Sequence, residues 1–398
     1  MIKPYMREDE CCGCTACKSI CPKNAITLQP NREGFLYPQV NTEICVDCSQ
    51  CVKVCDFQHR DTETKTFGDY PHVLAVRHRN KEVVECSTSG GAFTGISDFV
   101  LNRNGVVYGA TIDNDFVVKH IRAVSESDRN KLRGSKYVQS DLGGSFGSVK
   151  RDLDNGIEVL FTGTPCQCAG VKSYLERTKT SMDKLIICDF VCHGTPSPRL
   201  WKEHVASLQR RYKKKIEYYQ FRPKVNGWRN HTEAVVLKDG KKVYKPAFIQ
   251  KHKQIFYSHL ALRKSCYNCK YTSIFRDTEL TIADCWGIEK KVPEWNDDRG
   301  VSLVLINNKK GEKIFDSIKD NFEYRQIDIK DFMQPQLQHP ANKPKQREEF
   351  WNEYYQHGYK FIVKKYTTCN FKDEIILAVI NLLRRTGMIN IVKKIIRR

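Results

Sequence analysis

Cysteines near the start of the chain have the spacing of iron–sulfur ligands. The stretch CCGCTACKSICP at residues 11–22 contains five cysteines, and four of them fit the pattern C-x2-C-x2-C-x3-C-P: Cys11, Cys14, Cys17 and Cys21. In bacterial ferredoxins with this run, three neighbouring thiolates bind one 4Fe–4S cluster and the fourth binds a second cluster. The first run therefore predicts that a second run follows.

The second run is CVDCSQCVKVC, which supplies Cys45, Cys48, Cys51 and Cys55. Because the fourth cysteine of each run ligates the other cluster, we expect one cluster on Cys11, Cys14, Cys17 and Cys55. The other is then expected on Cys21, Cys45, Cys48 and Cys51. Between the runs, AITL and GFLYPQV flank PNRE and predict a short hairpin. Cys12 has no assigned ligand role. Zinc is the main alternative, but zinc spacings pair two ligands and then leave a gap.

The composition favours a cytoplasmic metalloprotein. The chain has 398 residues, enough for two or three domains. The opening MIKPYMREDE lacks the apolar segment of a signal peptide. Eighteen cysteines without an export signal indicate metal binding in a reducing compartment rather than a disulfide framework. The net charge of +20 favours anionic partners.

After a polar linker at 56–71, short apolar runs alternate with helical patterns. Strands are predicted at 73–76, 106–112, 157–163, 184–191 and 301–307, and helices at 91–103, 142–153, 167–177 and 197–212. This alternation predicts an α/β domain with a mostly parallel sheet. The segment 216–245 is expected to be antiparallel, with Asp239-Gly240 as a hairpin turn. The fold class predicted is thus an α+β ferredoxin-like two-cluster domain (1–60), then an α/β domain (72–335), then a basic helical tail (340–398).

A second group of cysteines follows the predicted strands. Cys166 comes directly after the strand at 157–163, and Cys192 directly after the strand at 184–191. Open α/β sheets place their ligands at these carboxyl ends. Cys266 and Cys269 form a separate C-x2-C pair, so the four thiols are candidates for one site. A zinc half-site, a redox dithiol and ordinary buried cysteines remain alternatives.

Seven motifs carry a family resemblance. With the two cysteine runs, they resemble the family of coenzyme F-420 hydrogenase/dehydrogenase beta subunits over about residues 1–335, and they occur in this order: STSGGAF, RGSKYVQS, GTPCQCAG, VCHGTPSP, FRPKVNGW, CYNCKY and TIADCWGIEK. The resemblance implies an oxidoreductase that binds FAD in the α/β domain beside a third 4Fe–4S cluster. Carried over by motif, the ligands of that cluster are Cys166, Cys192, Cys266 and Cys269. Cys168 and Cys285 stand where the family's usual pattern has no cysteine, and they compete as ligands.

The flavin site is expected on two segments. Ser89, Gly90 and Gly91 precede a predicted helix, whose free N–H groups suit a pyrophosphate. The other segment supplies cations, a hydroxyl and an aromatic ring: Arg133, Ser135, Lys136 and Tyr137. An ordinary turn and a solvated helix end are the alternatives. For the substrate we expect an anionic, planar molecule facing Arg222, Lys224 and Trp228, with a basic hairpin as the alternative. His193, beside Cys192, is the candidate catalytic residue.

The function predicted is a cytoplasmic iron–sulfur flavoprotein. Its flavin exchanges hydride with an organic substrate, a deazaflavin coenzyme or another molecule, and its clusters exchange electrons with a soluble redox partner such as ferredoxin, or with a partner enzyme. One alternative is a non-catalytic electron-transfer subunit or adapter, as in surface polysaccharide biosynthesis. Another is a zinc-bearing nucleic-acid protein. For the tail, helix packing on the main domain and attachment to an anionic membrane surface or partner both stay open.

Overall fold

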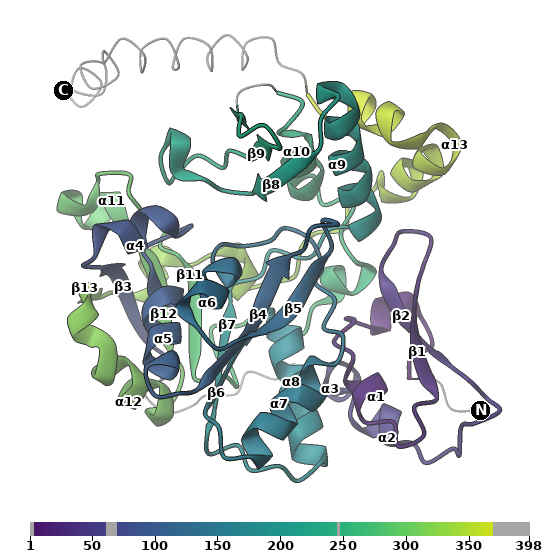
Figure 1. Cartoon of the computed structure of the whole chain (residues 1–398), viewed down its shortest axis with the longest axis horizontal. Helices are drawn as coiled ribbons and strands as arrows, with labels where there is room; N and C mark the ends of the chain where they lie inside the picture. Colours follow the sequence, from purple (N-terminus) through teal and green to yellow (C-terminus); the bar gives the residue numbers. More distant parts are fainter. Residues whose placement is uncertain (1–3, 61–69, 245–246, 369–398) are drawn as a thin grey trace.

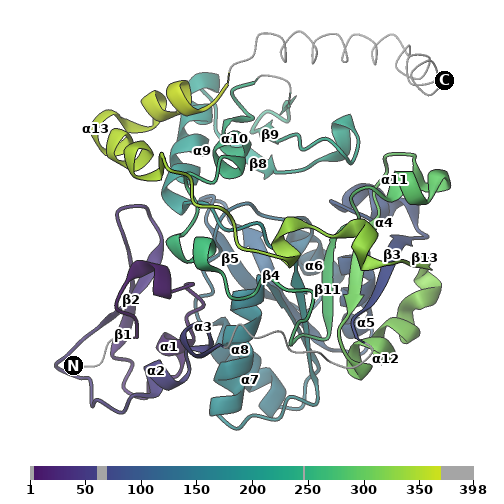
Figure 2. The ribbon, with the colours of Figure 1, turned by 180° about the vertical axis from the view of Figure 1, so that it is seen from behind.

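The structure is a computed structural model, and it describes residues 4–60, 70–244 and 247–368 (Figure 1). An N-terminal unit lies beside a large central sheet, and a smaller unit lies above one end of that sheet. Seen from behind, the segment that follows the last strand of the central sheet crosses the molecule to the final described helix (Figure 2). In the described part of the chain, no helix has the length and apolar character needed to cross a bilayer.

The N-terminal unit has the hairpin that the sequence predicts. Strand β1 (Ile26–Pro30) pairs antiparallel with β2 (Leu36–Val40), and Ile26 faces Val40. The Asn31 side chain closes the turn, because it accepts hydrogen bonds from the N–H groups of Glu33 (3.1 Å) and Phe35 (3.0 Å). The remaining elements are short: η1 (Glu8–Glu10), α1 (Ala16–Ser19), α2 (Gln50–Lys53) and α3 (Asp56–His59).

The two cysteine runs share a backbone conformation. Gly13 and Thr15 in the first run have φ values of 75° and 66°. Asp47 and Ser49, at the equivalent places of the second run, have φ values of 50° and 59°. A left-handed conformation is unfavourable for a residue with a side chain. Its repetition at both Thr15 and Ser49 indicates that each run needs the same tight loop to turn its cysteines inward.

The central sheet has eight strands in the order β13-β3-β12-β11-β7-β6-β4-β5. The prediction of a mostly parallel sheet is wrong, since only the pairs β4–β6, β6–β7 and β7–β11 are parallel. Antiparallel strands flank this parallel centre on both sides. The strands are β3 (His72–His78), β4 (Val106–Ile112), β5 (Val118–Ala123), β6 (Val159–Gly163), β7 (Leu185–Phe190), β11 (Leu280–Asp284), β12 (Ser302–Ile306) and β13 (Phe322–Gln326).

Helices cover both faces of the sheet. Helices α7 (Ser145–Asp154) and α8 (Pro165–Arg177) pack on β4, β6 and β7, and Val54 and Phe57 of the N-terminal unit join the same apolar core. The other face is covered by α5 (Ala92–Leu101) and α12 (Lys309–Ile318). The N-terminal unit therefore docks against the α7–α8 layer of the sheet. Shorter elements complete this part: α4 (Lys81–Cys86), α6 (Glu126–Leu132), α11 (Ile288–Lys291), η4 (Pro293–Trp295), η5 (Lys319–Asn321), η6 (Ile329–Phe332) and η7 (Pro335–Leu337).

The smaller unit contains a three-stranded antiparallel sheet in the order β10-β9-β8. The predicted turn is present between β9 and β10, where Gly240 has φ 78° and its N–H bonds to the carbonyl of Leu237 (2.8 Å). The last described helix bends at Gly358 (φ 77°) and packs on α9 and α10. The predicted tail beyond residue 368 lies outside the described residues. The elements of this unit are α9 (Pro198–Tyr212), β8 (Ile216–Gln220), η2 (Lys224–Asn226), β9 (Ala234–Leu237), β10 (Lys242–Val243), α10 (Lys251–Tyr257) and α13 (Arg347–Tyr366). The short helix η3 (Lys264–Asn268) follows α10 and contacts η1 of the N-terminal unit.

Candidate functional site

Two hollows in the N-terminal unit are walled by the two cysteine sets that the spacing predicts, and Cys12 also lines one of them. The outer set is Cys21, Cys45, Cys48 and Cys51, around a hollow that also touches Val46. The inner set is Cys11, Cys14, Cys17 and Cys55. In each set, the fourth cysteine of one run joins three cysteines of the other run.

The two sets differ in how far they lie from solvent. Cys48 of the outer set is exposed, whereas Cys14 of the inner set is buried. Cys14 packs against helix α8: a Cβ added at Gly170 would lie 2.7 Å from the Cβ of Cys14. Burial, together with the neighbouring thiol of Cys14, raises the pKa of Cys55 to about 12. The outer set thus faces the surface, and the inner set faces the α/β part.

The four dispersed cysteines come together at the carboxyl ends of β6 and β7. Cys166 lies in the first turn of α8, directly after β6, and Cys192 follows β7. Cys266 lies in η3 and Cys269 follows it. Burial raises the pKa of Cys192, and the nearby sulfurs of Cys266, Cys166 and Cys269 raise it further. These four cysteines, the third set, therefore lie near one another. The sequence placed Cys166 and Cys192 at strand ends, but it did not place the pair Cys266 and Cys269 beside them.

The competing cysteines lie elsewhere. Cys285 is fully buried in an apolar core with Trp228 and Ile288, and that core contains no cysteine of the three sets. Burial, with Asp284 and Glu289 nearby, raises the pKa of Cys285 to about 12. Cys168 is also fully buried, on the core side of α8. Cys12 was missed as a residue of interest. The neighbouring thiols of Cys14 and Cys166, together with burial, raise the pKa of Cys12, so it lies between the inner and third sets.

A cavity of about 490 Å³ adjoins the third set, and Cys192 lies in its wall. Its size is typical of pockets that bind small molecules or cofactors. Most of the residues predicted to bind flavin or act in catalysis line it: Ser89, Gly91, Arg133, Ser135, Lys136, Tyr137 and His193. Gly91 is the N-cap of α5, so the free N–H groups of that helix begin at the cavity.

Gly90 and Lys136 have structural contacts that the sequence did not reveal. A Cβ on Gly90 would lie 2.4 Å from the carbonyl oxygen of Val76, so this glycine allows the loop to pack on the sheet. The Lys136 ammonium donates to the carbonyls of Lys131, Leu132 and Arg133 at 2.8–3.2 Å, at the end of α6. Burial lowers the pKa of Lys136 to about 7.

Arg133 is the cation best placed for an anion in the cavity. Its Nε is buried and has no hydrogen-bond partner among the described residues. A buried donor without a partner is unfavourable, so an anionic group that accepts from Arg133 would be stabilised there. His120 has a comparable feature, since its Nδ1 is buried without a partner and the residue lines the same cavity. Nothing in its local sequence marks His120 as a site residue.

The residues expected to face the substrate are largely bonded to the protein. Arg222 lines the cavity, but it pairs with Asp284 and lies 5.0 Å from the Trp286 ring centre. Lys224 donates to the carbonyls of Val84 and Ser89 (both 2.6 Å). Trp228 is buried and stacks on Trp286, with ring centres 4.8 Å apart. Asp284, Trp286 and Tyr257 also line the cavity and were missed.

His193 lies in the cavity wall with both ring nitrogens in hydrogen bonds. Its Nε2 is 2.8 Å from Nε2 of His259, and its Nδ1 is 2.7 Å from Nε2 of Gln336. Burial, together with the neighbouring ring of His259, lowers the pKa of His193 to about 4. The imidazole is therefore neutral near pH 7.

Comparison with known proteins agrees with this arrangement. Residues 10–58 match the model of the 4Fe-4S dicluster domain, and residues 157–331 match the model of the C terminus of the coenzyme F420 hydrogenase/dehydrogenase beta subunit. Fold and site therefore define an iron–sulfur electron-transfer protein of the oxidoreductase class. The similarity to coenzyme F420 hydrogenase/dehydrogenase beta subunits that the motifs predict is confirmed over residues 157–331.

Two individual proteins show the extent of the similarity. The F subunit of the F(420)H(2) dehydrogenase of Methanosarcina mazei is 21% identical over 339 residues, which cover 81% of this chain and 86% of that protein. A chain of the F420-reducing NiFe hydrogenase complex from Methanosarcina barkeri is 18% identical with a TM-score of 0.45, over 73% of this chain and 91% of that chain.

Proposed function

We propose that this chain moves single electrons between a protein partner at its surface and a flavin in the cavity, where an organic substrate exchanges hydride. The observation that carries the proposal is the order of the cysteine sets. The outer set faces solvent, the inner set contacts helix α8, and the third set adjoins the cavity. We assign one 4Fe–4S cluster to each set, because four thiolates saturate one cluster.

The cavity fits FAD by its size and by its lining. Arg133 and the first turn of α5 would hold the pyrophosphate, since the Arg133 Nε has no partner among the described residues and no side chain caps α5. Tyr137 offers an aromatic face beside them. A bound flavin supplies the exchange between two-electron and one-electron chemistry. His193 is the proposed proton-transfer residue, because its ring reaches the cavity and is hydrogen-bonded to His259.

Chemical analysis of anaerobically purified protein tests the proposal. We expect about twelve irons and one flavin per chain, and reduction of the N-terminal clusters when the hydride donor is supplied. A reduced deazaflavin coenzyme is the first donor to screen. Stoichiometric zinc with little iron would contradict the cluster assignment. Full cluster content without turnover of any hydride donor would favour a non-catalytic role within a larger enzyme, a function supported by the relative that is named as part of a dehydrogenase.

The flavin assignment predicts a loss of affinity on removing Arg133. Arg133→Ala is expected to weaken flavin binding roughly tenfold to a hundredfold, the usual worth of a hydrogen bond to a charged group. Iron content should stay unchanged, because Arg133 contacts none of the cysteine sets. Lys131→Ala is the matched control, since its exposed ammonium pairs with Asp128 outside the cavity. Flavin fluorescence after gel filtration measures the effect, and equal retention by both variants would contradict the assignment.

The outer set predicts where a redox partner docks. Ile44 and Val46 are exposed apolar residues beside Cys45 and Cys48, with Val46 55% exposed. Val46→Asp is expected to slow reduction by an acidic ferredoxin roughly tenfold, because like charges oppose encounter. Val124→Asp is the matched control, being 56% exposed and far from the cysteines in sequence. Stopped-flow kinetics would show the difference, and equal slowing would place the docking surface elsewhere.

A further inference from the structure

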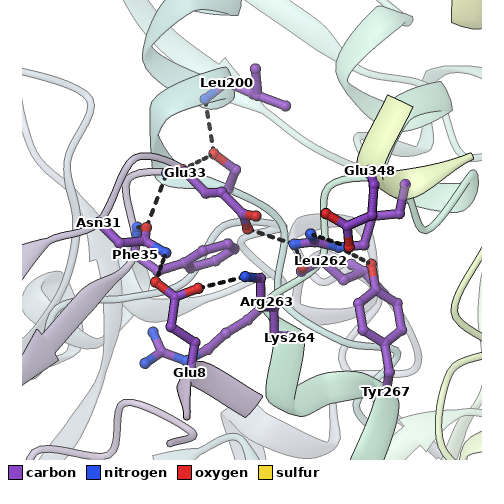
Figure 3. A network of polar contacts seen from close by, with 12 residues as sticks. Glu8, Asn31, Glu33, Phe35, Leu200, Leu262, Arg263, Lys264, Tyr267 and Glu348 are labelled. Atoms are coloured by element: carbon purple, nitrogen blue, oxygen red, sulfur yellow. Dashed lines mark hydrogen bonds and ion pairs between the residues drawn. The ribbon is translucent and has the colours of Figure 1, made fainter. Parts of the chain in front are cut away.

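Arg263 is a buried cation at the junction of the N-terminal unit and the α/β part. Its side chain is 1% exposed. Its Nε donates to the carbonyl of Cys11 (2.8 Å), and its Nη1 donates to Oε1 of Gln139 (2.9 Å). Its Nη2 donates to the carbonyl of Leu36 (3.1 Å) and lies 3.5 Å from the Sγ of Cys11. Figure 3 shows Arg263 among the polar groups that join the hairpin β1–β2 to η3.

The guanidinium has no carboxylate partner. Over residues 4–60, 70–244 and 247–368, no Asp or Glu oxygen lies within ion-pair distance of it. Glu8 pairs with Lys264 instead (2.8 Å), and Glu33 pairs with Arg347. The ring of Tyr37, 4.1 Å from the guanidinium carbon, adds only a weak attraction. An arginine stays charged in a protein, so this charge is buried and uncompensated by the carboxylates around it.

The groups that face Arg263 are cysteine sulfurs, which are thiolates when they ligate a cluster. Cys11 of the inner set contacts Arg263 directly, and Cys266 of the third set is the third residue after it in the chain. On the same junction, Cys12 lies between Cys14 and Cys166. A positive charge and an N–H···S contact both stabilise the more negative, reduced form of a cluster, so they raise its reduction potential. A buried charge acts over such distances because the dielectric constant is low.

We propose that Arg263 is a positioning residue that makes the inner cluster easier to reduce than the outer one. When the outer cluster is oxidised, its electron passes to the inner cluster, at the junction beside the third set. This inference rests on the proposed assignment of 4Fe–4S clusters to the cysteine sets. It adds a role for a residue outside every cysteine motif.

Redox titration of the full iron-loaded chain, followed by EPR, tests the proposal. In Arg263→Gln, the equilibrium constant for electron transfer from the outer to the inner cluster should fall at least tenfold. This corresponds to a fall of about 59 mV in the reduction potential of the inner cluster relative to the outer one. The reduction potential that shifts in Val46→Asp is assigned to the outer cluster, because Val46 lines the hollow of the outer set. Arg347→Gln is the matched control, since Arg347 is equally buried at the same junction but bonds to Glu33, Tyr267 and the Leu262 carbonyl. It should change that equilibrium less than threefold.

A second pair of variants covers a failure of Arg263→Gln to load iron. Gln139→Glu would place a carboxylate against Nη1 of Arg263 and neutralise its charge, so the inner couple should again fall. Gln139→Met, which adds no charge, should leave the equilibrium constant for electron transfer from the outer to the inner cluster within threefold of the wild-type value. Arg263→Lys should restore most of the potential, because it keeps the charge. Three clusters with unmoved couples in Arg263→Gln or Gln139→Glu would overturn the inference. A wild type without three clusters would instead overturn the proposed function.

Discussion

Replacing Cys166 with serine is expected to remove about four irons per chain, one 4Fe–4S cluster, while the N-terminal clusters remain. Cys166 is one of four thiols that converge at the ends of β6 and β7, and iron–sulfur clusters select soft thiolates over harder oxygen ligands. Since the third set lies between the inner set and the cavity, electron exchange between substrate and outer cluster should also fall. The loss should exceed the roughly 10- to 100-fold typical of losing a residue outside the ligand shell.

Cys285→Ser provides the control for that experiment. Cys285 is more buried than the four proposed ligands, so a general effect of placing a hydroxyl in the interior would appear there too. Its apolar core with Trp228 is separate from the three sets, so iron content should not change. Iron and sulfide analysis with EPR of dithionite-reduced protein measures both variants. If Cys285→Ser removed a cluster and Cys166→Ser did not, the ligand choice for the third set would be wrong.

The N-terminal cysteine sets could be predicted because their geometry is local. Each run carries its own loop, and the left-handed residues Thr15 and Ser49 repeat that loop in both runs. The third set could be predicted only through strand ends, because Cys166 and Cys192 become neighbours when β6 and β7 pair. The position of Cys12 could not be predicted, since it depends on how the N-terminal unit docks on α8. Docking brings together residues far apart in the chain.

The cavity illustrates the same limit for side-chain roles. The residues Arg133 and Tyr137, which the sequence predicts to bind flavin, line the cavity. The sequence did not reveal that the Lys136 ammonium would be bonded to carbonyls at the end of α6. The position of Lys136 just after a helix could have indicated this contact, since a lysine near the C-terminal end of a helix often binds the last carbonyls of that helix. Gly90 gave no comparable signal, because the strand backbone that it contacts lies at Val76 and Ser302.

Strands β3, β4, β6, β7 and β12 of the central sheet were predicted, whereas β5, β11 and β13 were not. Strands β4, β6 and β7 are apolar runs buried on both faces, which is the pattern that parallel strands show. Strand β13 exposes four of its five residues, so its apolar pattern is too weak to distinguish it from a loop. Strand β5 alternates buried and charged residues, among them Lys119 and Arg122. The edge strands β5 and β13 therefore carried a weak signal, whereas β3 and β12, which also pair antiparallel, were predicted as strands.

Gly170→Val is expected to displace the inner cysteine set and destabilise the chain. Gly170 lies within α8, and a Cβ there would stand 2.7 Å from the Cβ and 2.9 Å from the Sγ of Cys14. Cys14 is held from the other side by its own loop, so α8 and the N-terminal unit must move apart. Overpacking of this kind costs about 1–3 kcal/mol of unfolding free energy. The moved ligand should further cost about four irons per chain, those of the inner cluster.

Gly147→Val is the matched control, because Gly147 lies in the neighbouring helix α7 and a Cβ there has nothing within 4 Å. Valine and glycine differ little in helix propensity, so this variant should unfold at the wild-type temperature and keep all its iron. Anaerobic thermal unfolding by circular dichroism, with iron analysis of the same samples, compares the pair. The close contact between α8 and Cys14 would be refuted if both variants kept the wild-type iron content and stability. Equal losses in both variants would instead show that valine disturbs either helix by itself.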